Sequence, residues 1–240
     1  MKYQVDLFAH GSKYTTAKTF SSFSLNERIA AGISAGANTQ GKVTPNEDGL
    51  SIVTFDDTIK LYMVADAHFG CEASKIALQR FPELLSSATL LEEALVPAAQ
   101  ELNTIICDER DDESETTFLA VLQQQDKTHF LSVGDSLLYR YSDGKSRHVK
   151  ARYSLNCYLG ERSILPKSAY CQGLLDPFAD GFALLTDGFE SSHLEEKALD
   201  DVFRHSSLQQ GIDRIMKRLI DEGENPGNKP DNGAIVVVKR

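Results

Sequence analysis

The sequence is poor in cysteine and contains no closely spaced cysteine pair. Its 240 residues include four cysteines, at positions 71, 107, 157 and 171. Disulfide-rich domains and structural zinc sites need cysteines at short, regular spacings. The pattern therefore argues against both kinds of site and indicates a protein of the reducing cytoplasm.

Long hydrophobic runs are also missing. No apolar stretch approaches the roughly 18 residues that a membrane-spanning helix needs. The first ten residues, MKYQVDLFAH, have neither the apolar segment nor the cleavage site of a secretory signal. We therefore expect a soluble protein with no membrane partner, and its 41% hydrophobic content is sufficient for a core of its own.

Positive charge is scarce as well. The chain has 25 Lys and Arg residues against 35 Asp and Glu residues, a formal net charge of −10. This balance argues against nucleic acid or an anionic membrane as a partner. It is compatible with a site built from carboxylates, which needs cations to hold it together.

What the sequence does contain is a regular order of strand-like and helix-like segments. Hydrophobic patterns predict strands at 28–34, 50–55, 59–65, 116–123, 128–133, 137–141, 182–186 and 233–239. Helical periodicity appears at 73–85, 91–106, 193–203 and 208–222. Runs of strands separated by helical pairs indicate an α+β fold, with a central antiparallel β-sandwich flanked by helical pairs.

We expect one domain over residues 31–240. Residues 1–30 show no clear period after a possible strand at 2–8, and are interpreted as an N-terminal extension or a first strand. Residues 146–180 are irregular in pattern and are interpreted as a short flap. The acidic run at 107–115 is interpreted as a solvated connector in preference to a metal site.

The first helical pair carries signals for its ends and its shape. Thr89 and Glu92 have the spacing of a capping box, which predicts the start of the second helix. Pro82 and Pro97 lie inside the helical segments and predict a kink or a break in each.

Four acids stand at the ends of apolar runs. Asp66 and Asp187 follow such runs, whereas Asp48 and Asp231 precede them. In antiparallel neighbours the end of one strand lies beside the start of the next, so these acids can share one rim of the sheets. Asp135, in a tight turn between two strands, can reach the same rim. Each acid alone is also an ordinary turn former.

Carboxylates gathered at one edge would repel one another and have raised pKa values. Cations must then neutralise them, and oxygen ligands suit Mg²⁺ or Mn²⁺. Two such ions about 3.5–4 Å apart can hold a water poised to attack a phosphate ester. His68, beside Asp66, could protonate the leaving oxygen.

Six short motifs resemble those of the metal-dependent protein phosphatases, the PPM or type-2C Ser/Thr family, and they occur in the family order. They are NEDG at 46–49, VADAHFG at 64–70, SETT at 114–117, VGDSLLYRY at 133–141, LLTDGFE at 184–190 and DNGAIVVV at 231–238. The resemblance implies a β-sandwich flanked by helices, with a two-metal centre at one edge.

Carried over by motif, the resemblance implies that Asp66 bridges both metal ions. Asp187 and Asp231 would complete one ion's site, and the backbone carbonyl of Ala67 would bind the other ion. Glu47 and Asp48 would act at this second ion directly or through water. The metals implied are two Mn²⁺ or Mg²⁺ ions.

The resemblance also assigns roles around this pair. Asp48 would act beside Glu47, and Asp135 matches an acid that binds a third, weaker metal in many members. His68 matches the proposed general acid. Asn232 and Thr117 would support the ligands from behind.

The implied substrate is phosphoserine or phosphothreonine in a protein, with a cognate Ser/Thr kinase as a possible partner and a monomer as the expected state. The sequence departs from the family where an Arg usually precedes the NED motif to clamp phosphate. Lys42 could substitute there as a point charge.

Three further departures fall inside the motifs, where Ala67, Phe69 and Glu115 replace small residues or glycine. They keep a second interpretation open, a weak or inactive phosphatase-like protein that binds a partner. A third, a nuclease, is disfavoured by the acidic balance and by the lack of a basic, aromatic groove.

Overall fold

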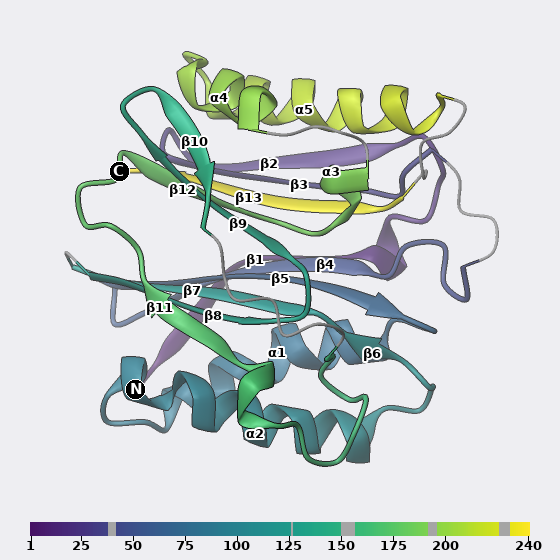
Figure 1. The fold of residues 1–240 in the computed structure, drawn as a ribbon, viewed down its shortest axis with the longest axis vertical. Helices are drawn as coiled ribbons and strands as arrows, with labels where there is room; N and C mark the ends of the chain where they lie inside the picture. Colours follow the sequence, from purple (N-terminus) through teal and green to yellow (C-terminus); the bar gives the residue numbers. More distant parts are fainter. Residues whose placement is uncertain (38–41, 126, 150–156, 192–195, 226–230) are drawn as a thin grey trace.

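The computed structural model describes residues 1–240 except 38–41, 126, 150–156, 192–195 and 226–230. Two antiparallel β-sheets stack face to face, and each carries a helical pair on its outer side (Figure 1). Every strand pair described is antiparallel. The predicted α+β sandwich with flanking helical pairs is therefore confirmed.

The first sheet has the strand order β1–β4–β5–β7–β8–β11, with the short β6 beside β5. Its strands are β1 (Tyr3–His10), β4 (Asp48–Phe55), β5 (Ile59–His68), β6 (Glu115–Thr116), β7 (Phe118–Gln124), β8 (Lys127–Val133) and β11 (Cys171–Leu174).

The second sheet has the order β10–β9–β12–β13–β3–β2. Its strands are β2 (Phe20–Asn26), β3 (Ile29–Ser34), β9 (Leu137–Ser142), β10 (Lys145–His148), β12 (Gly181–Leu185) and β13 (Gly233–Lys239).

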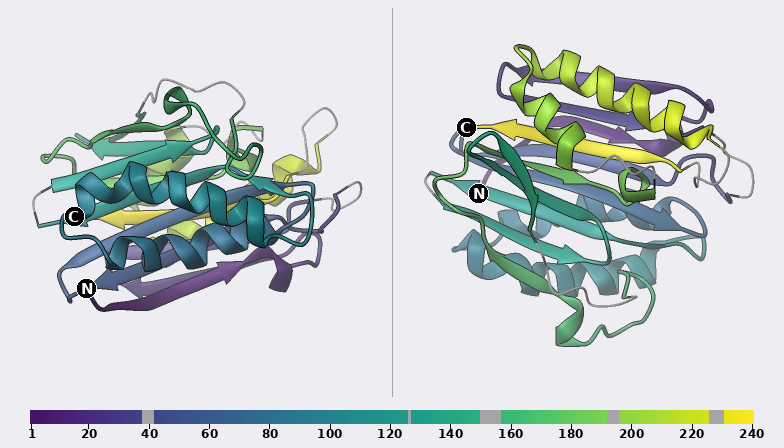
Figure 2. Two further views of the ribbon diagram at one scale, coloured as in Figure 1. Left: turned by 90° about the horizontal axis from the view of Figure 1, so that it is seen from below. Right: turned by 45° about the horizontal axis from the view of Figure 1, so that its top comes forward.

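Helices cover both outer faces, as the two views of Figure 2 show. The first sheet is covered by α1 (Glu72–Ser86) and α2 (Leu91–Glu109), and the second by α4 (Glu196–Arg204) and α5 (Leu208–Gly223). The short α3 (Gly188–Ser191) follows β12, and two 3-10 turns lie at Gly11–Lys13 and Lys167–Ala169. None of the helices in the described part of the chain is long and apolar enough to cross a membrane.

The core is layered because side chains alternate along each strand. In β5, Leu61 and Met63 pack toward α1 and α2, whereas Tyr62 and Val64 face the second sheet. The sandwich interior therefore lies between two apolar strand faces, and each outer face is closed by the apolar stripe of its helices.

The N-terminal 30 residues supply an edge strand to each sheet. β1 pairs with β4 in the first sheet, and β2 pairs with β3 in the second. The strand β2 has no alternating apolar pattern, and its apolar side chains Phe20, Phe23 and Leu25 are only partly buried against the two cores.

The segment 146–180 is not wholly irregular. β10 ends within it at His148, and β11 adds an edge strand beside β8. β11 is only four residues long and includes Gly173, which lies against the ring of Phe130. So short a strand with a glycine in it carries no readable period.

Two predictions about the first helical pair are corrected by the structure. Both helices continue through Pro82 and Pro97 without a break, since burial of their apolar faces against the sheet outweighs one lost hydrogen bond, and a kink at each stays a prediction. The N-cap of α2 is Leu90 and has no side-chain cap, so the predicted capping box at Thr89 does not form.

Candidate active site

The hairpin of β4 and β5 brings the first two predicted acids together. Its turn includes Asp56 and Asp57, which both have positive φ, 44° and 60°. The register that follows from this turn places Asp48 directly opposite Asp66. Both are buried, with 2% and 5% of their surface exposed.

The second sheet reaches the same place through the end of β12. Thr186 donates a hydrogen bond from Oγ1 to Oδ2 of Asp48 at 2.7 Å, and Asp187 follows it directly. The start of β13 lies alongside, because Thr186 Oγ1 also accepts the backbone N–H of Ala234 at 2.9 Å. Acids from both sheets therefore converge at one rim, as the strand-end argument predicts.

Burial and mutual repulsion set the electrostatics of this rim. Burial raises the pKa of Asp48 to about 7, although the ammonium of Lys42 opposes the rise. Burial, together with the charges of Asp48 and Asp187, raises the pKa of Asp66 well above its usual value. These carboxyls ionise readily only with positive charge beside them.

Lys42 supplies such a charge from within the chain. Its Nζ lies 2.7 Å from Oδ1 of Asp231 and 3.8 Å from Oε2 of Glu47. Burial alone would lower the pKa of Lys42, but the charges of Asp48 and Asp231 raise it. The ammonium therefore stays charged and faces the acids of the rim.

Asn232 holds this group from behind. Its backbone N–H donates to Oδ1 of Asp231 at 2.9 Å. With its amide oriented so that both ends are satisfied, its side-chain nitrogen donates to the carbonyl of Ala35 at 3.0 Å. The side-chain oxygen then accepts from Nζ of Lys42 at 3.1 Å and from the N–H of Glu47 at 3.0 Å.

Thr117 has the same relation to Asp66. Its Oγ1 accepts the backbone N–H of Asp66 at 3.0 Å, and its own N–H donates to the Asp66 carbonyl at 2.8 Å. The hydroxyls of Thr117 and Ser136 are 2.8 Å apart, which joins this strand end to the turn that contains Asp135.

Tyr158 is a rim residue that the motifs do not single out. Its ring meets the ring of His68 edge-on, with centroids 4.9 Å apart. Burial raises its pKa to about 12, with added contributions from the charges of Asp135, Glu115 and Asp187. Its position among these groups locates Asp135 and His68 on the same side of the molecule as the other acids.

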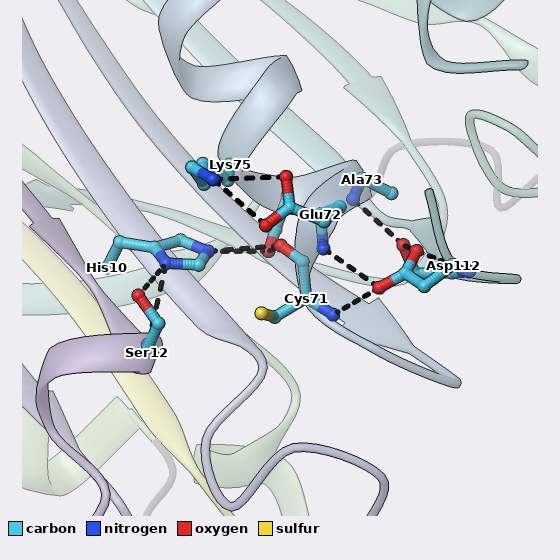
Figure 3. Close-up of polar contacts among 9 residues, drawn as sticks. His10, Ser12, Cys71, Glu72, Ala73, Lys75 and Asp112 are labelled. Carbon is cyan, nitrogen blue, oxygen red and sulfur yellow. Dashed lines mark hydrogen bonds and ion pairs between the residues drawn. The ribbon is translucent and has the colours of Figure 1, made fainter. Parts of the chain in front are cut away.

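A polar network fixes the start of α1, immediately after the VADAHFG motif (Figure 3). Oδ2 of Asp112 accepts the backbone N–H groups of Cys71 at 3.1 Å and Glu72 at 3.3 Å. The ring of His10 contacts Oγ of Ser12 at 2.9 Å and the carbonyl of Cys71 at 3.2 Å. The run at 107–115 is thus more than a solvated connector, because Asp112 caps a helix and residues 107–109 belong to α2.

This network also joins α1 to the NED motif. Ser74 Oγ donates to the backbone carbonyl of Glu47 at 2.8 Å, and Gly70 N–H donates to Oε1 of Glu47 at 3.0 Å. Burial raises the pKa of Glu47. The helix start and the strand ends therefore form one scaffold under the rim.

The donor set suits a hard divalent cation, since carboxylate oxygens from both sheets meet in a buried place. Among the residues that the structure describes, however, no three Asp, Glu, His or Cys side chains form a ready-made metal cluster. Asp231 and Glu47 face the ammonium of Lys42, and Asp48 faces Thr186. The carboxylate oxygens are of the kind that a hard cation prefers, and those of Asp231, Glu47 and Asp48 make contacts within the chain.

A family model described as Protein phosphatase 2C matches residues 35–226. The chain belongs to the protein phosphatase 2C family. The resemblance of the six sequence motifs to this family is therefore confirmed.

Solved structures of bacterial phosphatases share the fold. The Staphylococcus aureus serine/threonine phosphatase Stp1 has a TM-score of 0.69 at 15% identity, over 95% of this chain and 96% of that chain. The Mycobacterium tuberculosis serine/threonine phosphatase PstP/Ppp has a TM-score of 0.65 at 18% identity, over 88% and 97%. The catalytic domain of PstP in complex with two manganese ions has a TM-score of 0.64 at 19% identity, over 92% and 99%. No curated sequence matches significantly.

The structure shows where this phosphatase 2C family member carries the three residues that depart from the family motifs. Ala67 lies in β5 without a positive φ, so its methyl group is compatible with the backbone. Phe69 has φ 64° and is 63% exposed, so its ring points largely to solvent. Glu115 lies opposite His68 in the β5–β6 pair.

Proposed function

We propose that this protein hydrolyses phosphoserine and phosphothreonine in proteins at the rim formed by the two sheets. The observation that carries this proposal is the register that sets Asp48 opposite Asp66, with Thr186 and Asp187 of the second sheet beside them. Bound Mn²⁺ or Mg²⁺ would supply charge neutralisation and an activated water.

The chain's own groups have separate tasks in this proposal. Asp66, Asp187 and Asp231 would hold one metal ion, with Asp66 shared with the other. The carbonyl of Ala67 and the carboxylates of Glu47 and Asp48 would serve that second ion. Asp135 would serve a third, weaker site.

The remaining groups handle the substrate. His68 would donate a proton to the leaving oxygen of the serine or threonine. Lys42 would contact the phosphoryl group as a point charge, and Asn232 and Thr117 would keep the acids in position. Tyr158, in the segment that we propose as a flap, would hold the ring of His68 in place through their edge-on contact.

The test is phosphate release from a phosphoserine peptide and from an aryl phosphate by Mn²⁺-loaded protein. We expect Asp66→Asn and Asp187→Asn to lower kcat/KM at least about 100-fold, the upper end of what ligand-supporting residues alone cost. Asp201→Asn, on the exposed surface of α4, is the control and should retain activity. Release that is equally fast in all variants, or absent throughout, contradicts the proposal.

The leaving group separates the role of His68 from that of the metals. An aryl oxide is stable enough to leave as an anion, whereas the oxygen of serine needs a proton in order to leave. We therefore expect His68→Gln to slow the phosphopeptide about 100-fold or more and the aryl phosphate much less.

One observation favours a second candidate, a phosphatase-like protein that binds a partner with little or no catalysis. The ammonium of Lys42 pairs with Asp231, one of the carboxylates proposed to hold a metal ion. Calorimetric titration with Mn²⁺ distinguishes the candidates, because a protein that binds no metal cannot use a metal-activated water.

A further inference from the structure

The ammonium of Lys42 lies in a built pocket of oxygen atoms. It is 2.7 Å from Oδ1 of Asp231, 3.1 Å from the amide oxygen of Asn232 and 3.8 Å from Oε2 of Glu47. The side chain of Lys42 is 21% exposed, and those of Asp231 and Glu47 are each 5% exposed. This pairing is therefore largely shielded from solvent.

The same ammonium compensates more than one acid. Its charge also acts on Asp48 and Asp66, the pair at the centre of the rim. Buried carboxylates without a partner are strongly destabilising. A tethered cation at this point offsets part of the repulsion between these acids.

A metal ion held by Asp231 and this ammonium would draw on the same carboxylate charge. The ammonium lies 2.7 Å from Oδ1 of Asp231, so a divalent ion bound to that carboxylate would lie close to Nζ. The two positive charges would also repel each other within a few ångströms.

Lys42 is not held in a helix or a strand. It lies in the irregular segment before β4, beside Val43, which is 71% exposed. Lysine carries a compact charge on a flexible four-carbon stem, so it can leave one anion and contact another.

We propose that Lys42 is a built-in counter-cation that competes with the metal for Asp231, so that metal binding frees its ammonium for the substrate phosphoryl group. The release of the ammonium toward the phosphoryl group rests on the proposed function, whereas the competition with the metal for Asp231 does not. Metal and phosphate would then bind cooperatively, because the first releases a ligand of the second.

Calorimetric titration of metal-free protein with Mn²⁺ tests the competition. We expect Lys42→Met to bind Mn²⁺ about tenfold more tightly than the wild type, since no ion pair has to be broken. Metal-free Lys42→Met should also unfold at a lower temperature, because its acids lose their compensation. Unchanged or weaker Mn²⁺ binding by Lys42→Met overturns the inference.

Lys217→Met is the matched control for net charge. It removes one lysine from the exposed surface of α5, where Lys217 pairs with Asp221 at 2.9 Å. We expect its Mn²⁺ affinity to equal that of the wild type. If Lys217→Met gains affinity as Lys42→Met does, the effect is one of net charge and the inference is wrong.

A double-mutant cycle locates the contested ligand. In an Asp231→Asn background, Lys42→Met should raise Mn²⁺ affinity by clearly less, because the shared carboxylate has lost its charge and only the effect on Asp48 and Asp66 remains. An undiminished gain in that background contradicts competition at Asp231. Should Lys42→Met fail to fold, Lys42→Gln provides the same comparison.

Inorganic phosphate tests the second half. Added to Mn²⁺-loaded protein, it should bind about tenfold more weakly to Lys42→Met than to the wild type. Equal phosphate binding overturns the release of Lys42 toward phosphate. Metal competition in a protein without any phosphatase activity would support the inference and refute only the proposed function.

Discussion

At the scale of single residues, Phe69 is the most unusual feature of the rim. It adopts φ 64°, a left-handed conformation that bulky residues avoid, and its ring is 63% exposed. The next residue, Gly70, has φ 139° and no side chain to clash. The chain therefore turns sharply between β5 and α1, and this turn aims the N–H of Gly70 at Glu47.

The effect of substituting Phe69 on the free energy of unfolding should depend on the backbone preference of the new residue and not on its size. We expect Phe69→Val to lower the free energy of unfolding by about 1–2 kcal/mol, because a β-branched residue tolerates the left-handed region poorly. Phe69→Asn should be neutral or stabilising by up to about 1 kcal/mol, since Asn accepts this conformation. Urea unfolding measures both, and the reverse order would show that contacts of the Phe69 ring matter more than strain.

Lys42 lies where an arginine would precede the NED motif in the family, and the two residues differ in how they bind phosphate. An arginine would present a rigid, planar fork to phosphate, whereas a lysine is a mobile point charge. In this structure that charge lies on Asp231 at 2.7 Å. Under the proposed function, Lys42 would hold phosphate by charge alone, and under the further inference the same charge compensates Asp231.

At the scale of elements, the start of α1 depends on a residue far away in the chain. The N-cap position, Cys71, provides no side-chain cap, and Asp112 accepts two of the free N–H groups in its place. Ser114 Oγ accepts a third, from Ala73, at 2.9 Å. The acidic loop after α2 thus closes the end of α1 next to the site (Figure 3).

Removal of this remote cap should loosen α1. We expect Asp112→Ala to lower the free energy of unfolding by about 1–2 kcal/mol, the usual value of a helix cap. Asp111→Ala, which alters an exposed neighbour in the same loop, should cost less than about 0.5 kcal/mol. Denaturant titration compares the two, and equal losses would show that the loop as a whole, not the cap, is responsible.

At the scale of the whole molecule, His10 links the first sheet to the first helical layer. It ends β1, is 1% exposed, and contacts the Cys71 carbonyl and Ser74 Oγ at the start of α1. Burial lowers its pKa from 6.5 to about 4. The charges of Lys75 and Lys13 act in the same direction, while Glu72 and the Cys71 carbonyl oppose them.

This buried imidazole makes global stability depend on pH. Between pH 6.5 and 4 the unfolded chain takes up a proton at His10 that the folded chain does not. The stability that His10 contributes is therefore fully present above pH 6.5. It is lost as the pH falls, and the loss in the free energy of unfolding approaches about 3 kcal/mol below pH 4. Urea unfolding from pH 7.5 to 5 should show this loss, and His10→Gln should remove it; an equal slope in both proteins would assign the loss to other groups.

The sequence by itself determined the sandwich and its acid-bearing strand ends. Nearly continuous apolar runs predict β4, β5, β12 and β13, since a strand buried on both faces must be apolar along most of its length. The antiparallel rule then predicts that Asp48 and Asp66 meet, because strand ends and strand starts share an edge. These features depend on local pattern and on one pairing rule.

Only the tertiary structure decided which partners those residues find. Lys42 on Asp231, Asp112 on the start of α1, and Tyr158 beside His68 each join segments with no regular spacing between them. The edge strands β2 and β11 likewise depend on a neighbour to pair with. A periodic pattern records which face of an element is buried, but the partner of a polar side chain depends on where distant elements pack, and no local pattern carries that information.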